Sequence, residues 1–78
     1  MPHIVIKTLA GKQKEQLQEL SDQIAAVVNK TLGAPEKVIS VSVEEYTFEE
    51  WEGVYDECIK GKENVLVKPG YTNPKTFE

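Results

Sequence analysis

The sequence predicts an α/β (or α+β) fold built on one βαβ unit, in which a helix joins two parallel strands. Three stretches indicate this fold: residues 2–8 alternate as a strand does, residues 13–32 have a helical period, and residues 38–45 alternate again. A helix that connects two such strands gives parallel pairing and a right-handed crossover. At 78 residues, we expect the whole chain, 1–78, to be a single domain.

The first stretch is a short strand with two different faces. Ile4 and Ile6 lie on one side, whereas His3, Val5 and Lys7 lie on the other. This mixture is typical of a strand with one face on a core and the other in an interface or in solvent. Gly11 then marks a turn.

The second stretch is an amphipathic helix. Apolar side chains recur at spacings of three and four, which places them on one stripe: Leu17, Leu20, Ile24, Val27, Val28 and Leu32. Gly33 is the residue type that caps a helix C-terminus, and Pro35 follows shortly after it. A helix packed on a sheet is therefore predicted.

The second half of the chain begins with another strand and another helix. In residues 38–45, valine and isoleucine alternate with polar side chains. Thr47 and Glu50 then have the spacing of a capping box, so a second helix is expected from Phe48 to about Ile59. Its apolar stripe is Trp51, Val54, Tyr55 and Cys58. Residues 64–67 are compatible with a short strand or a last helical turn.

Composition excludes several classes of protein. The net charge is −4, and the positive charge is carried by scattered lysines with no arginine, so no nucleic-acid footprint is expected. One histidine and one cysteine provide neither a metal-ligand cluster nor an internal disulfide. No apolar run is long enough for a membrane span and no secretory signal is present, so the cytoplasm is expected. A core this small needs support, and we expect homo-oligomerisation to provide it.

By elimination, the unusual chemical group is the nitrogen of Pro2. It is an amide while Met1 is attached and becomes a basic secondary amine once Met1 is removed. An ordinary α-amino group titrates near ~8, and burial in an apolar pocket lowers its pKa further because desolvation disfavours the charged form. The alternative is that Pro2 merely permits removal of Met1 and has no chemical role.

A catalytic amine would need an apolar wall and a cation beside it. Trp51 is the best candidate for the wall, although a single tryptophan on a helix is often a core aromatic. Lys12, in the turn after the first strand, could hold an acidic substrate and stabilise a developing enolate. The alternative for Lys12 is a solvated turn residue.

Taken together, these residues resemble the 4-oxalocrotonate tautomerase family. The resemblance is carried by Met1-Pro2-His3-Ile4, the turn at Gly11-Lys12, the helix end Leu32-Gly33-Ala34-Pro35 and the strand that runs to Glu44-Glu45. It covers residues 2–51 without gaps. The longer second helix and Lys68-Pro69-Gly70-Tyr71 resemble the dimeric branch of the family rather than the hexameric one.

The resemblance implies a cofactor-independent and metal-independent tautomerase. Pro2 would act first as general base and then as general acid on a 2-hydroxydienoate or an enolised 2-keto acid. The family's two carboxylate-binding arginines fall on Lys12 and Ser40, so the resemblance favours a monocarboxylate such as phenylenolpyruvate over a dicarboxylate as a probe of the activity. The aromatic of the pocket falls on Trp51, and His3 would lie beside the site as a hydrogen-bonding helper.

The leading hypothesis is thus a homodimer with a four-stranded sheet and helices on one face. It would act on a small carboxylate-bearing enol or keto substrate near each Pro2. A related dehalogenase or hydratase using the same proline stays open. A non-catalytic βαβ binding module is the competing class, and retention of Met1 would favour it.

Overall fold

The computed structural model describes residues 1–78, which form two compact units, Met1–Glu45 and Tyr46–Glu78. The first unit contains β1 (His3–Leu9), α1 (Lys14–Leu32) and β2 (Ser40–Tyr46), whose last residue opens the second unit. The second unit contains α2 (Trp51–Val54) and the segment that follows it. The single domain expected from the sequence stays a prediction.

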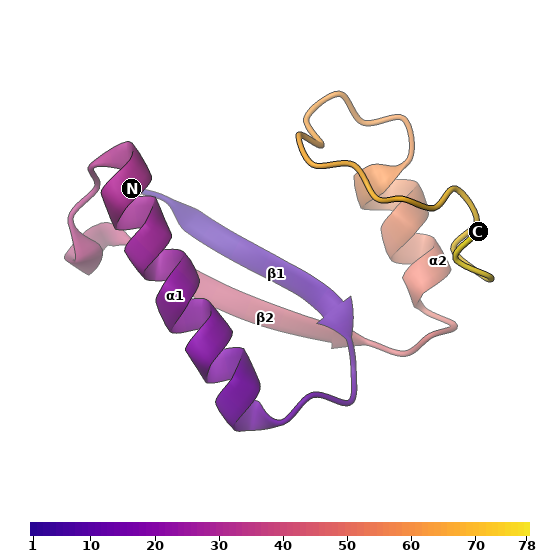
Figure 1. The fold of residues 1–78 in the computed structure, drawn as a ribbon, viewed down its shortest axis with the longest axis horizontal. Coiled ribbons are helices and arrows are strands. Elements are labelled where there is room, and N and C mark those ends of the chain that lie inside the picture. The colour runs from indigo at the N-terminus through magenta and orange to yellow at the C-terminus, as the bar shows by residue number, and fades with distance from the viewer. The chain divides into compact units, whose positions relative to one another are not determined.

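The first unit is the βαβ motif that the sequence predicts. β1 and β2 are hydrogen-bonded neighbours, and Figure 1 shows their arrows pointing the same way. At the start of the pair, the Ser40 N–H donates to the Pro2 carbonyl at 3.2 Å. β2 begins at Ser40, two residues later than predicted, because residues 36–38 form a 3₁₀ turn in which the Val38 N–H donates to Pro35.

The two faces of the sheet differ as expected. Side chains of β1 alternate between half-buried Ile4 and Ile6 and exposed His3, Val5 and Lys7. Figure 1 shows α1 running across the two strands. The other face carries contacts between the strands, among them an ion pair between Lys7 and Glu44 at 3.3 Å.

Both ends of α1 are capped by local chemistry. At its start, the Gln13 N–H donates to Oε1 of Gln16 at 3.1 Å. At its end, Gly33 adopts a left-handed conformation with φ of 73°, and its N–H donates to the Asn29 carbonyl at 2.9 Å. Glycine reaches this conformation without steric cost, so the predicted C-terminal cap is confirmed.

Only part of the apolar stripe of α1 is covered. Leu17, Ile24 and Val28 are half-buried, as expected for the side facing the sheet. The remaining members are exposed, by 41% at Leu20, 59% at Val27 and 69% at Leu32. The first unit therefore leaves apolar helix surface in solvent. No helix in the structure combines the length and the hydropathy that a membrane span requires.

The second unit begins with the predicted capping box. The Thr47 N–H donates to the Glu50 carboxylate at 2.7 Å, and the Glu50 N–H donates to the Thr47 hydroxyl at 3.1 Å. Regular α-helix starts at Trp51, three residues later than predicted, because residues 48–50 form the turn that these bonds close. From Tyr55 to Ile59 the helix widens into a π turn.

Aromatic packing holds the second unit together. All six aromatic residues of the chain lie in it, and the buried core of the structure is Val54 and Tyr55. Tyr71 brings the C-terminal segment into this cluster, with its ring centroid 5.5 Å from that of Tyr55 and 5.0 Å from that of Phe77. The C-terminal segment is thus folded back on the helix of its own unit.

Residues 64–67 are neither strand nor helix, so both predictions for this stretch were wrong. A strand needs a neighbouring strand for its backbone hydrogen bonds, and the sheet contains only β1 and β2. Leu66 and Val67 instead stand in solvent, 91% and 89% exposed.

Candidate active site

Pro2 lies where the chain enters the sheet. It is half-buried, and its carbonyl accepts the Ser40 N–H, which ties it to the first residue of β2. Met1, by contrast, is 99% exposed. Loss of Met1 would therefore remove no packing. It would leave the Pro2 nitrogen as a free amine directly before the N-terminal end of β1.

His3 is held between two serines of the neighbouring strand. Its Nδ1 lies 2.7 Å from the Ser40 hydroxyl, and its Nε2 lies 3.4 Å from the Ser42 hydroxyl. In a neutral imidazole one nitrogen donates and the other accepts, and a hydroxyl can do either. The two serines therefore hold the imidazole on the exposed face of the sheet, next in sequence to Pro2.

Three of the predicted site residues, Pro2, His3 and Ser40, are thus brought together. Sequence reasoning named Ser40 only as the position of a family arginine and did not name Ser42. The signal that was available is the two-residue alternation of β2, since Ser40 and Ser42 share a face. What could not be read from alternation alone is the register that sets them opposite His3.

Lys12 lies far from Pro2 within one chain. It follows the C-terminal end of β1, whereas Pro2 precedes the N-terminal end. A seven-residue strand spans about 20 Å. Lys12 is exposed and makes no ion pair or hydrogen bond. The structure therefore does not place Lys12 beside the proline of its own chain.

Trp51 belongs to the second unit and is half-buried there. Its indole N–H donates to the Tyr71 hydroxyl at 2.9 Å, and its ring packs edge-on against Tyr46 with centroids 6.3 Å apart. Trp51 is thus an ordered aromatic of its unit. Its role as a wall for Pro2 stays a prediction.

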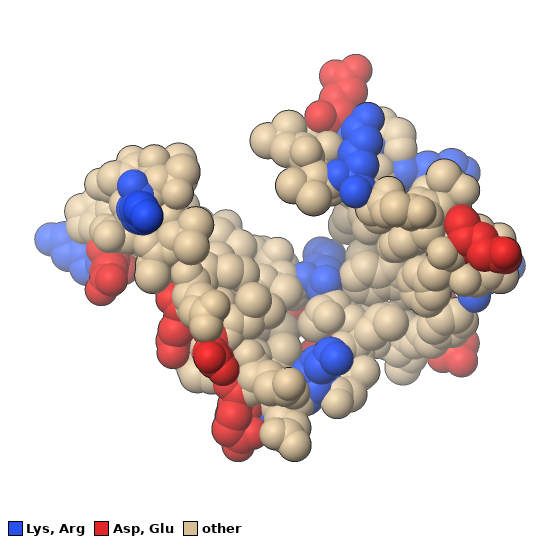
Figure 2. Space-filling model, in the orientation of Figure 1, with Lys and Arg blue, Asp and Glu red and all other residues tan.

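The lysines do not form one patch on the face that Figure 2 draws. They stand apart from one another there, while several acidic residues lie close together at the lower left of the view. No group of three or more His, Cys, Asp and Glu side chains is arranged to hold a metal ion. The groups available at the start of β1 are therefore an imidazole, two hydroxyls and the backbone of Pro2.

Comparison with known proteins decides the family. The model of the family described as "Tautomerase enzyme" matches residues 2–62. The chain belongs to the tautomerase family. A probable tautomerase of Xylella fastidiosa (strain 9a5c) is 37% identical over 73 residues, which cover 91% of this chain and 89% of the relative.

Solved tautomerase-family structures share the βαβ fold. TomN, a 4-oxalocrotonate tautomerase homologue of the tomaymycin biosynthetic pathway, aligns with a TM-score of 0.62 and 32% identity, covering 64% of this chain and 77% of TomN. A structure described in an analysis of trans-3-chloroacrylic acid dehalogenase activity aligns with a TM-score of 0.56 and 26% identity, over 59% of this chain and 87% of that one. This tautomerase is therefore an enzyme of the 4-oxalocrotonate tautomerase type, as its residues predict.

Proposed function

We propose that this enzyme interconverts the enol and keto forms of a small 2-keto acid, with Pro2 as the catalytic acid and base. The observation that carries the proposal is the position of Pro2. The family match begins at this residue, and Pro2 directly precedes β1 and follows an exposed Met1. Removal of Met1 creates a secondary amine at the start of the sheet.

The reaction moves one proton and needs no redox step. The neutral Pro2 nitrogen accepts the proton of the enol hydroxyl as the oxygen becomes a carbonyl. The resulting prolinium then gives a proton to the adjacent carbon, which completes the keto form and restores the amine. Such catalysis works best when the pKa of the amine lies near the working pH. We expect Trp51 to supply the apolar wall that lowers it.

The substrate carboxylate needs a cation, and Lys12 is our candidate. Since Lys12 and Pro2 lie at opposite ends of β1, a site that contains both must take Lys12 from another copy of the chain. The exposed apolar side chains Leu20, Val27 and Val5 support association of this kind. We therefore propose that the enzyme is a homodimer rather than a hexamer. In this proposal His3 and Ser40 lie beside the substrate, and the enzyme acts in the cytoplasm.

A dehalogenase reaction is the second candidate. It is favoured by the 26% identity to the structure described for trans-3-chloroacrylic acid dehalogenase activity. In that chemistry water adds to the chlorinated double bond and chloride leaves. It requires a group that activates water, for which His3 is the available candidate.

The deciding experiment measures ketonisation of phenylenolpyruvate by ultraviolet absorbance, on protein shown by intact mass to lack Met1. Pro2→Ala is expected to lower kcat/KM by at least about 100-fold, since a positioned acid–base group typically contributes 10² or more. The wild-type rate should also fall as the pH drops below the pKa of the amine, because the protonated nitrogen cannot accept a proton.

Pro35→Ala is the matched control, because Pro35 is an exposed loop proline, and it should keep the wild-type rate. Undiminished turnover by Pro2→Ala would contradict the proposal. A folded, Met-free wild type with no ketonisation but with chloride release from trans-3-chloroacrylate would favour the dehalogenase. A wild type isolated with Met1 attached and inactive in both assays would favour the binding module.

A further inference from the structure

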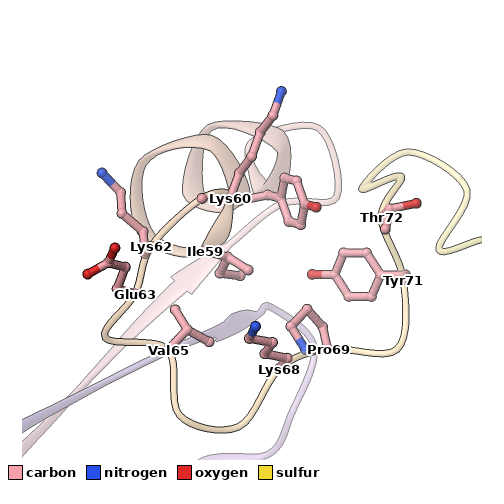
Figure 3. Close-up of a pocket in the computed structure, with 11 residues that line it drawn as sticks. Ile59, Lys60, Lys62, Glu63, Val65, Lys68, Pro69, Tyr71 and Thr72 are labelled. Atoms are coloured by element: carbon pink, nitrogen blue, oxygen red, sulfur yellow. The ribbon is translucent and has the colours of Figure 1, made fainter.

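The second unit contains a cavity whose lining includes none of the residues proposed for the proline chemistry. Its volume is about 370 Å³, and it lies between the π turn after α2 and the loop that leads to Tyr71. Figure 3 shows Ile59, Val65, Pro69 and Tyr71 around its interior. Its walls are therefore mainly apolar and aromatic, and its size falls within the range of small-molecule sites.

Three lysines line this cavity: Lys60, Lys62 and Lys68. None of their side-chain amino groups makes an ion pair or hydrogen bond within the chain, and the cavity is lined by one carboxylate, that of Glu63. In Figure 3 the amino group of Lys68 is turned toward the middle of the cavity, whereas Lys60 and Lys62 extend from its rim. An apolar interior is thus combined with cations that have no counter-ion.

This combination selects one chemical class of ligand. An apolar interior favours a ring or aliphatic body, and a lysine ammonium at its mouth favours an anion attached to that body. Tyr71 adds an aromatic surface and a hydroxyl, and Figure 3 shows its ring directed into the cavity. A free inorganic anion would be attracted to the lysines but would make no favourable contact with the apolar walls.

We propose that the cavity bounded by Ile59, Lys68 and Tyr71 binds a small aromatic monocarboxylate as a second ligand site, whose lining does not include Pro2. All residues that line it fall within residues 55–72, so the site is complete in one chain. It does not rest on the proposed tautomerase reaction. A site of this class lets an organic acid bind the enzyme without occupying the proline.

The structure supplies a reporter for this site. Trp51 is the only tryptophan, and its indole N–H donates to the Tyr71 hydroxyl at 2.9 Å. Phenylacetate, titrated into the Met-free full-length protein, is expected to give a saturable change in Trp51 fluorescence. Benzyl alcohol, which lacks the charge, and acetate, which lacks the ring, should each bind at least tenfold more weakly.

Variants then locate the binding. Lys68→Gln is expected to weaken phenylacetate binding at least fivefold, and Lys37→Gln, which removes an exposed lysine of the first unit, should not change it. Pro2→Ala should bind as the wild type does, whatever its ketonisation rate. In an ¹H–¹⁵N correlation spectrum, the ligand should shift amides of residues 55–72 most strongly.

Three outcomes would overturn the proposal. The first is the absence of a saturable response in folded protein. The second is equal affinity of wild type and Lys68→Gln. The third is loss of binding in Pro2→Ala with the largest amide shifts at residues 2–4, which would assign phenylacetate to the proline site. Because the readout is binding rather than turnover, these results are independent of whether the enzyme ketonises phenylenolpyruvate.

Discussion

At the scale of single residues, the contact between His3 and Ser40 is the feature that the structure adds to the site. The shorter of the two serine contacts, at 2.7 Å, comes from Ser40, and the longer, at 3.4 Å, comes from Ser42. If His3 assists the reaction, Ser40 acts as its positioning residue.

We expect Ser40→Ala to lower kcat/KM for phenylenolpyruvate roughly two- to tenfold, which corresponds to the net value of one hydrogen bond. Ser42→Ala should have a smaller effect because its contact is longer. The same variants in a His3→Ala background should no longer differ from their parent. Additive losses in that background would show that the serines act without His3.

Lys12 supports a second prediction at this scale. It is exposed and unpaired in the chain, so its removal should leave folding unchanged. Surface substitutions of this kind usually change stability by no more than about 0.5 kcal/mol. If Lys12 of one copy holds the substrate carboxylate near the Pro2 of another, Lys12→Gln should raise KM several-fold and Lys12→Arg should preserve it.

Lys37→Gln is the matched control for Lys12, and it should keep the wild-type KM. Steady-state kinetics over a range of salt concentrations would check the assignment, since screening weakens a carboxylate–lysine contact. A Lys12→Gln enzyme with unchanged KM would exclude Lys12 from the site.

At the scale of elements, two glycines allow the effect of backbone conformation on stability to be distinguished from the effect of side-chain packing. Gly33 ends α1 with φ of 73°, whereas Gly53 lies inside α2 with an ordinary helical backbone. A Cβ added at either position meets nothing within 4 Å. The two substitutions to alanine therefore differ only in backbone conformation.

We expect Gly33→Ala to lower the free energy of unfolding by about 1 kcal/mol, because an L residue is strained in the left-handed region. Gly53→Ala should raise it by about 0.5–1 kcal/mol, because alanine favours the helix. Chemical denaturation of both variants beside the wild type measures the two signs. If both substitutions change the free energy of unfolding in the same direction, the explanation from backbone conformation is contradicted.

At the scale of the whole molecule, the chain buries little by itself. Its buried side chains are Val54 and Tyr55, and neither belongs to the first unit. A domain of this length needs additional support. Val5 on the uncovered face of the sheet is 44% exposed, and apolar surface of this kind is what a second copy would cover.

We therefore expect the wild type to sediment at twice the mass of the chain. Val5→Lys should shift it toward monomer and lower its melting temperature in a concentration-dependent manner, because a charge buried at an interface lacks a partner. Thr31→Lys adds the same charge at an exposed position near the end of α1 and should have neither effect. A monomeric wild type would contradict the dimer.

The sequence by itself determined the elements whose signals are local. Strand alternation, the helical period of α1, the glycine cap at Gly33 and the Thr47–Glu50 capping box depend on residues at most a few positions apart, and these elements were predicted correctly. Half of the apolar stripe of α1 is nevertheless exposed in the chain. Pro2 was predicted from chemistry, as an amine once Met1 is removed, and from the resemblance to the family, and its catalytic role stays a prediction. The stretch 64–67 was misjudged because an apolar run favours a strand only if a partner strand exists.

Only the tertiary structure decided which distant residues meet. It set Ser40 and Ser42 opposite His3, placed Lys12 at the far end of β1 from Pro2, and brought Tyr71 onto Tyr55 and Trp51. The physical reason is that these relations follow from strand register, strand direction and the return of the C-terminal segment. Each of these relations depends on how segments far apart in the sequence pack against one another. The pattern of residue types within one segment is therefore not enough to predict it.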